Sequence, residues 1–205
     1  MLKSQGHRKQ VKHFHEPGDF HELTFSCYRR MPLLTNDLWR RWLAEIIDEA
    51  AAAPRFHLNA FVFMPEHVHL LVWPTDREAT ADDISTFLAA VKRPLSRRVK
   101  AALKAEGTKS AQRLLERLTV RTRPGKTSFR FWQEGSGYDR NLQTEKSVMA
   151  SIDYIHDNPV KRRLVKIATK WKWSSARWYV SEGKQIDAEL PQLHFPSAEL
   201  FYSGT

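Results

Sequence analysis

Residues 56–74 read FHLNAFVFMPEHVHLLVWP, and this stretch decides the fold. Apolar and aromatic residues dominate on both sides of a short interruption at Met64-Pro65-Glu66. Because proline cannot donate a hydrogen bond to a strand ladder, its place inside an apolar run marks a turn or a strand boundary. The stretch therefore predicts two neighbouring strands in a hairpin-like arrangement.

One strand and one helix are expected before this hairpin. Apolar and polar residues alternate over 22–28, which predicts a half-buried strand. Asn36 or Asp37 can cap the helix that follows, whose apolar residues recur along one face until Pro54 ends it. A βαββ order results for the first third of the chain.

Basic helical segments are expected after the hairpin. Residues 82–100 combine helically spaced apolar residues with a cationic far end, which predicts a basic helix with a break near Pro94. Residues 101–127 are polar and basic with weak periodicity, so we expect a variable helical or mobile insertion rather than core. Residues 128–133, SFRFWQ, alternate again and predict a strand that leads into a glycine-containing turn, EGSGYDRN (134–141).

The last predicted helix opens at Thr144 and is limited by Pro159, with Tyr154 in its last turns. The order β-α-β-β-α-β-α with antiparallel neighbours predicts an α+β fold. Helices should cover one face of the sheet and leave the other face for a site. We expect a basic N-terminal extension over 1–20, one domain over 21–180 that contains the 101–127 insertion, and a C-terminal tail over 181–205.

The charge balance indicates an anionic partner. Lys and Arg outnumber Asp and Glu by 33 to 23, which gives a net charge of +10 and attracts polyanions, with nucleic acid the favoured partner. A basic surface that serves only solubility is the alternative. The single cysteine, Cys27, excludes an internal disulfide and a thiolate zinc cluster, and no apolar run has signal-peptide or membrane-spanning length. A reduced, cytoplasmic location without membrane contact is expected.

His67 and His69 form a His-x-His pair on the second strand of the hairpin. Residues two apart on a strand point to the same face, with Cα atoms about 7 Å apart, which suits two ligands of one metal. Two ordinary polar residues on a solvated strand are the alternative, although the flanking strand is strongly apolar. Leu71 occupies the position at which a two-zinc hydrolase has an acidic residue, which argues against that class of enzyme. A divalent ion held by two nitrogens keeps positions open for phosphate oxygens and water.

Tyr154 and Asn158 are four residues apart and share one face of the last helix. A nucleophile and a metal ligand can therefore arrive on one element. A tyrosinate that attacks a phosphodiester keeps the bond energy in a phosphotyrosine link, whereas water would hydrolyse the strand irreversibly. A tyrosine that packs its ring inward is the structural alternative.

Four phrases together carry a family resemblance, namely MPEHVHLLV, FWQEGSGYDRN, YIHDNPVKRRLV and WKWSSA. In this order they resemble the single-tyrosine transposases of the HUH superfamily, and more narrowly the REP-associated tyrosine transposases. The resemblance runs from about Leu23 to Tyr179. It implies a ferredoxin-like or RRM-like antiparallel sheet, the HUH endonuclease fold.

The resemblance also implies a chemistry. His67 and His69 match the metal-ligand histidines, Tyr154 the catalytic tyrosine, and Asn158 the polar third-ligand position. The family cuts single-stranded DNA beside hairpins, using Mg²⁺ or Mn²⁺, and leaves a 5′-phosphotyrosine and a free 3′-hydroxyl. The implied partner is single-stranded DNA with REP-like hairpin repeats, bound by a monomer or a homodimer in the bacterial nucleoid.

Two departures and one competitor accompany the resemblance. Family members commonly have a small residue and glycine after the Asn-Pro step, where this chain has Lys161-Arg162-Arg163, and the 101–127 insertion is longer than expected. Tyr138 in the GYDRN phrase is a second candidate nucleophile, although it lacks a partner at helical spacing. We favour Tyr154 for the role.

Basic residues outside this centre are candidate DNA contacts, with a solvated face as the alternative. They are Lys92, Arg93, Arg97, Arg98, Arg140, Lys161, Arg162, Arg163, Lys170, Lys172 and Arg177. Trp171, Trp173 and Trp178 are candidates for stacking on bases, although core packing is favoured for Trp173. Two further functions compete with the enzyme: a hairpin-binding protein that has lost its chemistry, and an RNA-binding protein, which the lack of an RNP1-like phrase disfavours.

Overall fold

The computed structural model describes residues 19–52, 56–75, 81–135 and 137–196. Residues 1–18 of the expected N-terminal extension lie outside the described residues. So does Pro54, the expected end of the first helix. In chain order the main elements are β1 (Phe20–Ser26), α1 (Asp37–Ala52), β2 (Phe56–Phe63), β3 (His67–Pro74), α2 (Ala81–Glu106), α3 (Lys109–Leu118), β4 (Thr119–Arg123), β5 (Lys126–Phe129), β6 (Tyr138–Leu142), α4 (Glu145–Lys161) and α5 (Ala176–Val180).

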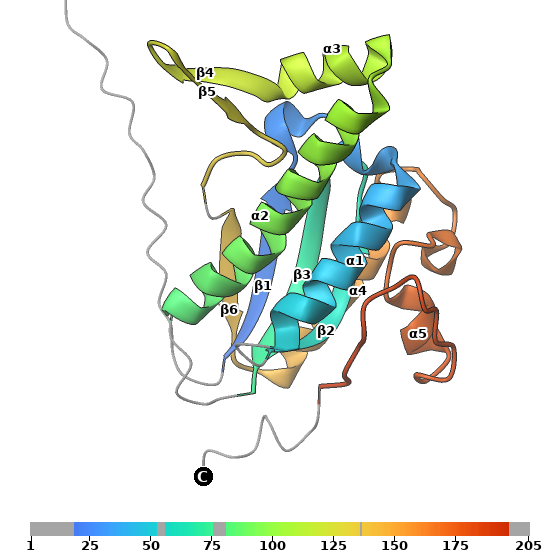
Figure 1. Cartoon of the computed structure of the whole chain (residues 1–205). Coiled ribbons are helices and arrows are strands. Elements are labelled where there is room, and N and C mark those ends of the chain that lie inside the picture. Colours follow the sequence, from blue (N-terminus) through green and yellow to red (C-terminus); the bar gives the residue numbers. More distant parts are fainter. Residues whose placement is uncertain (1–18, 53–55, 76–80, 136, 197–205) are drawn as a thin grey trace, which may run out of the picture.

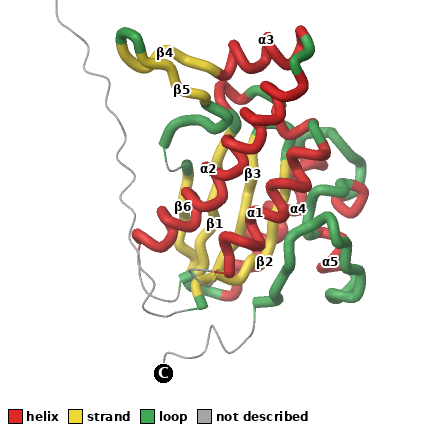
Figure 2. Tube along the Cα trace, viewed as in Figure 1, coloured by secondary structure: helices red, strands yellow, loops and turns green. Residues whose placement is uncertain are grey.

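Four of the strands form one antiparallel sheet in the order β2-β3-β1-β6 (Figures 1 and 2). The predicted hairpin over 56–74 is confirmed, because β2 and β3 pair along their length. In the centre of the sheet β1 lies beside β3, so that Thr24 is the register partner of His69 and Ser26 that of His67. The expected α+β fold with an antiparallel sheet is confirmed.

Helices lie on both faces of this sheet. On β3, Val68 and Leu70 belong to the larger apolar core, which they share with α1 and α2. Leu71 points to the opposite face, into a second core with Ile152 and Ile155 of α4. The expectation that helices cover only one face therefore needs correction, because the apolar stripe of α4 needs a sheet surface to bury it. The histidines of β3 share the parity of Leu71 and so face the α4 side.

The fourth strand of the sheet is not the expected one. The segment 134–141, expected to be a turn, supplies β6 from Tyr138 onward, and β6 pairs with β1. The strand expected over 128–133 splits instead: its first residues belong to β5, and Trp132 makes only an isolated bridge to Cys27. Polar side chains suffice for β6 because it is an edge strand with a largely solvated side.

Two helices contain a proline, and neither helix ends at it. α2 continues through Pro94, and α4 includes Pro159 and extends to Lys161. Val91 and Leu95 are buried on either side of Pro94, so packing against α1 offsets the hydrogen bond that proline removes.

The 101–127 insertion is ordered and only partly peripheral. It comprises the end of α2, then α3 and most of the two-stranded sheet β4-β5. Leu103, Ala111 and Leu118 are buried in the larger core, so the expectation of a segment outside the core was wrong for these positions. Among the described residues no helix is both long and apolar enough to cross a membrane.

Candidate active site

The two histidines of β3 converge on one point. His67 and His69 project from the same face, and their Nε2 atoms lie 3.1 Å apart. Both side chains are buried, with exposed fractions of 9% and 4%. The two histidines are therefore not ordinary polar residues on a solvated strand, which was the alternative interpretation of the sequence.

Each imidazole has a polar neighbour near its other ring nitrogen, as a hydrogen bond at His69 and as a carboxylate in ion-pair distance at His67. Thr24 Oγ1, from the neighbouring strand, lies 2.8 Å from His69 Nδ1. Glu66 Oε1 lies 3.3 Å from His67 Nδ1, and Arg162 Nη2 donates to the same carboxylate oxygen at 2.6 Å. Partners at Nδ1 fix the orientation of a metal-binding histidine and direct Nε2 outward.

Burial keeps both histidines neutral near pH 7. It lowers the pKa of His67, although the Glu66 carboxylate opposes this shift. Burial and the charge of the neighbouring His67 lower the pKa of His69 to about 3. Neutral imidazoles carry the lone pair that a metal ion requires.

Helix α4 carries the tyrosine to this pair. A capping box fixes its start, in which the side chains of Thr144 and Ser147 each bond to the backbone of the other. The Tyr154 ring is perpendicular to the His69 ring, with centroids 5.5 Å apart, and 43% of the residue is exposed. Asn158, one turn later, donates through Nδ2 to the Tyr154 carbonyl at 2.9 Å. The inward-packing alternative for Tyr154 fails, since the ring borders an open cavity.

These side chains line one cavity of about 740 Å³ between the sheet and α4. Its walls also carry four cationic residues, Arg30, Arg140, Lys161 and Arg162. The Lys161 ammonium lies 5.0 Å from the centre of the Tyr154 ring. A cavity with a phenol, two neutral imidazoles and four cations suits a phosphodiester.

Arg30 is a cavity residue that the sequence did not single out. It follows Arg29, and both have left-handed backbones with φ of 52° and 53°. Such a conformation costs about 1–3 kcal/mol for a non-glycine residue and concentrates at functional sites. The only available signal was the basic phrase YRR directly after β1.

The donor set fits a divalent cation. Two bare imidazole nitrogens 3.1 Å apart face each other's lone pairs unless a proton or a cation lies between them. Among the described residues no third histidine, cysteine or carboxylate completes a metal-binding cluster. Asn158 and the buried Glu22 line the same cavity and carry further oxygen atoms. Two nitrogens and one oxygen leave positions for substrate oxygens and water.

Tyr138 lines the same cavity and is 49% exposed. The structure therefore brings both candidate nucleophiles to one site, one on β6 and one on α4. The Tyr154 ring contacts a histidine of the pair, namely His69.

Comparison with known proteins shows a family likeness over the first part of the chain. Residues 19–116 match the family model described as "Transposase IS200 like". This segment is similar to IS200-like transposases. The matched residues include both histidines, whereas Tyr154 and Asn158 follow the matched segment.

Individual proteins that this chain resembles include one relative by sequence and two solved structures. A candidate REP-associated tyrosine transposase of Haemophilus influenzae is 23% identical over 150 residues, which are 70% of this chain and 76% of that protein. The solved structure of a REP-associated tyrosine transposase bound to a REP hairpin superposes with a TM-score of 0.62 and 21% identity, covering 93% of this chain and 96% of that one. A transposase structure from Deinococcus radiodurans has a TM-score of 0.42 at 19% identity, over 77% of this chain and 97% of that one. The expected resemblance to REP-associated tyrosine transposases is confirmed, and with it the fold.

Only some of the predicted DNA contacts lie at the cavity. Arg140, Lys161 and Arg162 line it, and Arg163 follows directly with a left-handed backbone. The four predicted contacts on α2 lie with the helices on the opposite face of the sheet. There Lys92 donates to the Gly135 carbonyl and Arg98 pairs with Glu45, while Arg93 and Arg97 border a shallow surface hollow.

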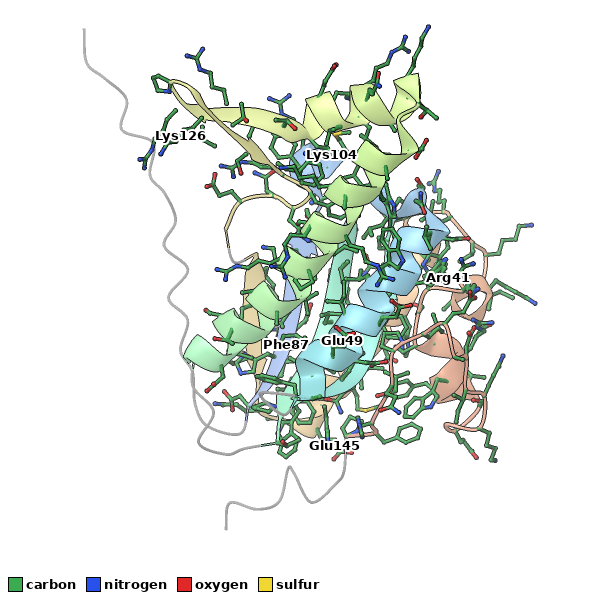
Figure 3. All side chains as sticks on the ribbon, in the orientation of Figure 1. Arg41, Glu49, Phe87, Lys104, Lys126 and Glu145 are labelled. Carbon is green, nitrogen blue, oxygen red and sulfur yellow. The ribbon has the colours of Figure 1, made fainter. Side chains whose placement is uncertain are left out.

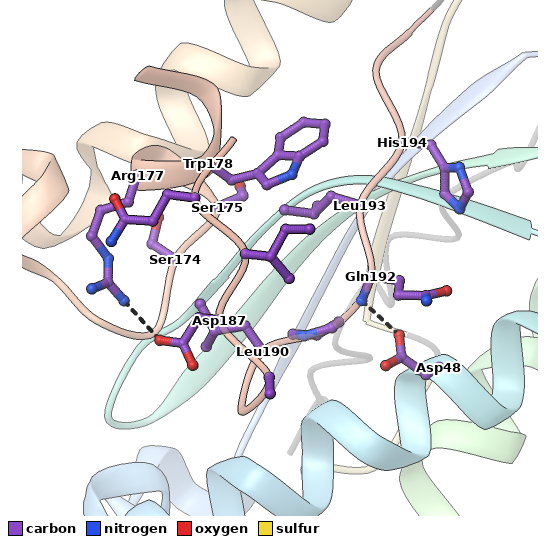
Figure 4. A pocket seen from close by; sticks show the side chains of 14 residues that line it. Asp48, Ser174, Ser175, Arg177, Trp178, Asp187, Leu190, Gln192, Leu193 and His194 are labelled. Carbon is purple, nitrogen blue, oxygen red and sulfur yellow. Dashed lines mark hydrogen bonds and ion pairs between the residues drawn. The ribbon is translucent and has the colours of Figure 1, made fainter. Parts of the chain in front are cut away.

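The three predicted contacts near the C-terminus belong to another part of the molecule. Lys172 forms an ion pair with Glu189, and Lys170 ends a short 3-10 helix. Arg177 pairs with Asp187 in a second cavity, of about 510 Å³, between the C-terminal segment and α1 (Figure 4). Trp173 is buried in the larger core as favoured, and its indole donates to Asp37.

Proposed function

We propose that this protein is a metal-dependent endonuclease and strand transferase that cuts single-stranded DNA beside hairpin repeats. Tyr154 is the proposed nucleophile. The observation that carries the proposal is the approach of the Tyr154 ring to His69 across a cavity lined by cations. The IS200-like family match supports a DNA-transposing activity of this general kind.

The proposed reaction is a transesterification. Tyr154 Oη, having lost its proton, attacks the scissile phosphorus, and the bond from phosphorus to the 3′ oxygen breaks. The 3′ oxygen takes up a proton and leaves as a free hydroxyl, while the 5′ phosphate stays on the tyrosine. Because one ester replaces another, a 3′-hydroxyl can reverse the step and rejoin a strand.

Different residues of the cavity have different proposed roles. Arg30, Arg140 and Arg162 neutralise the phosphate and orient it for in-line attack. His67, His69 and Asn158 would hold Mg²⁺ or Mn²⁺, which when bound polarises the phosphate and stabilises the leaving oxygen. Glu66 keeps His67 in place and also pairs with Arg162, so it links the metal ligands to the phosphate-binding side.

A hairpin repeat is the proposed substrate feature. The solved relative of similar fold is bound to a REP hairpin, and this chain has the charge of +10 that such a polyanion requires. A free strand can reach a cavity between sheet and helix more readily than a base-paired strand. We therefore place the cut in a single-stranded segment next to the stem.

The test is a covalent adduct. Labelled single-stranded DNA with a hairpin is incubated in Mn²⁺ with the wild type, Tyr154→Phe and Tyr138→Phe, and resolved on a denaturing protein gel. An adduct with the wild type and Tyr138→Phe, absent from Tyr154→Phe and from chelator-treated samples, is expected. An adduct that persists in Tyr154→Phe transfers the role to Tyr138. DNA binding with no adduct in any sample makes the protein a hairpin-binding module.

A further inference from the structure

A two-stranded ribbon, Thr119–Phe129, projects from the top of the molecule (Figures 1 and 3). We call it the basic ribbon; it consists of β4, β5 and the turn between them. All side chains from 121 to 128 are exposed, and only its base reaches the core. Three cations and no acid lie in this part: Arg121, Arg123 and Lys126.

The basic ribbon has little reason of its own to be stable. Two-stranded hairpins without an apolar face are marginal in water. Arg123 and Lys126 are register partners, and like charges directly opposite each other destabilise a strand pair. Within the described part of the chain, Arg121, Arg123 and Lys126 form no ion pair that offsets this repulsion. An anion between the strands' cations would relieve it.

The turn holds the two opposed cations in place. Pro124 and Gly125 connect the strands, and Gly125 has a φ of +73° that glycine adopts without strain. A proline-glycine turn shortens the tip to two residues, so Arg123 and Lys126 lie at its very end. The cations are thus displayed at a fixed point, far from the core.

Helix α3 continues the same charged surface. Lys109, Arg113 and Arg117 recur every four residues and are exposed, whereas Ala111 and Leu118 pack into the core. Residues four apart lie on one helical face, so these cations form a row. α3 and the basic ribbon lie end to end along one side of the molecule (Figure 1).

The base of the basic ribbon adjoins the active-site cavity. After Phe129 the chain returns to β1: the Tyr28 backbone donates to the Phe131 carbonyl, and Gln133 to that of Ser26. Ser26 and Arg30 line the cavity. From this base the tip extends by about 15 Å, given about 3.3 Å per strand residue.

We propose that the basic ribbon binds the double-stranded stem of the DNA substrate, with Arg121, Arg123 and Lys126 on its phosphates. A two-stranded ribbon fits the major groove of B-form DNA, about 12 Å wide, whereas the major groove of an RNA duplex is too narrow for side chains. The inference rests on the proposed function, since it assigns the stem to the ribbon and the single strand to the cavity. Phosphate contacts position a duplex without reading its sequence.

Salt dependence of binding tests this assignment. Each lost phosphate contact lowers the slope of log K against log salt by about 0.9 and weakens binding at 0.1 M by up to about eightfold. Arg123→Gln with Lys126→Gln should therefore lower the slope for a hairpin DNA by about 1.8 and weaken binding by about 10- to 60-fold. The control is Arg41→Gln with Lys184→Gln, which removes the same number of charges from two ion-paired cations outside the ribbon and the cavity, one half-buried and one exposed.

All binding is measured in the Tyr154→Phe background by fluorescence anisotropy, so that cleavage does not interfere. The substrates are a DNA hairpin with a single-stranded extension, an unstructured strand of equal length, and the corresponding RNA hairpin. We expect the ribbon variant to lose affinity for the DNA hairpin alone. The charge-preserving pair Arg123→Lys with Lys126→Arg should keep most of this affinity, because a phosphate contact of this kind depends on the positive charge and not on the shape of the cationic group.

Several outcomes overturn the assignment. These are equal losses in the ribbon and control variants, equal losses on hairpin and unstructured strand, or a stronger effect on RNA. Thermal unfolding of each variant separates a binding defect from a folding defect. Absence of the covalent adduct in the wild type would refute the proposed chemistry while the binding comparison still decides the role of the ribbon.

Discussion

Gly137 lies so close to β1 that a single methyl group should disturb the sheet. Its φ is +91°, and a Cβ atom there would lie 2.2 Å from the carbonyl oxygen of Thr24. Gly135 offers a matched control, because its φ is +104° but a Cβ atom there would meet nothing within 4 Å. Both glycines precede β6, which borders the active-site cavity through Tyr138 and Arg140.

The expected magnitude follows from this comparison. Alanine at either position destabilises the fold by a similar backbone strain of about 1–3 kcal/mol. Only Gly137→Ala must also move β6 back from 2.2 Å to ordinary contact at 3.4 Å, a shift of about 1 Å against a backbone atom. Such overpacking costs about 2 kcal/mol, within the usual range for crowded positions. At this chain length we expect Gly137→Ala to unfold about 4–8 °C below Gly135→Ala.

The assay is scanning calorimetry of the wild type and both variants. Because the shift displaces the cavity wall, the Gly137→Ala protein should also form less covalent adduct with hairpin DNA than Gly135→Ala. Equal melting temperatures for the two variants would refute the reasoning, since backbone strain alone would then account for both.

Three further predictions concern other parts of the molecule. Glu66→Gln should weaken Mn²⁺ binding by about 10-fold or more, measured by calorimetric titration, because it removes the charged partner that orients His67. Unchanged affinity would contradict this. Trp173→Ala should lower the free energy of unfolding by about 3–5 kcal/mol in urea titrations, since the indole is 3% exposed; a loss below 1 kcal/mol would place it outside the core. Burial and the nearby His194 lower the pKa of His57, so below its ordinary value of 6.5 the unfolded chain binds the proton more readily and stability falls with falling pH. His57→Gln should flatten this decline between pH 7 and 5 in thermal melts, and an unaltered slope would count against the assignment.

The central hairpin and the histidine pair were predictable from local rules. A strand places residues two apart on one face, so the convergence of His67 and His69 needed only the assignment of β3. A helix places Tyr154 and Asn158 on one face for the same kind of reason. The packing of α4 on the histidine side of the sheet was not predicted, because no local pattern tells which face a helix will cover. Only the family resemblance grouped Tyr154 with the two histidines in one site.

The errors arose where tertiary partners override local signals. Glycines 135 and 137 predicted a turn, yet the residues after them form β6 because β1 offers an open edge. Pro94 predicted a break, yet burial of Val91 and Leu95 against α1 keeps α2 continuous. The left-handed backbone of Arg30 has no sequence signature, so the basic phrase YRR alone did not place this residue in the cavity.

One consequence of the α4 packing concerns how such a protein could evolve. If Tyr154 and Asn158 act as proposed, nucleophile and metal ligand depend together on the apolar contact of Ile152 and Ile155 with the sheet. One enlarged or polar side chain in that contact would displace the nucleophile and the metal ligand together. Every cation on the basic ribbon would stay in place. Natural selection could thus convert a mobile-element enzyme into a resident DNA-binding protein through a single buried substitution, leaving the reactive residues themselves unaltered in the sequence.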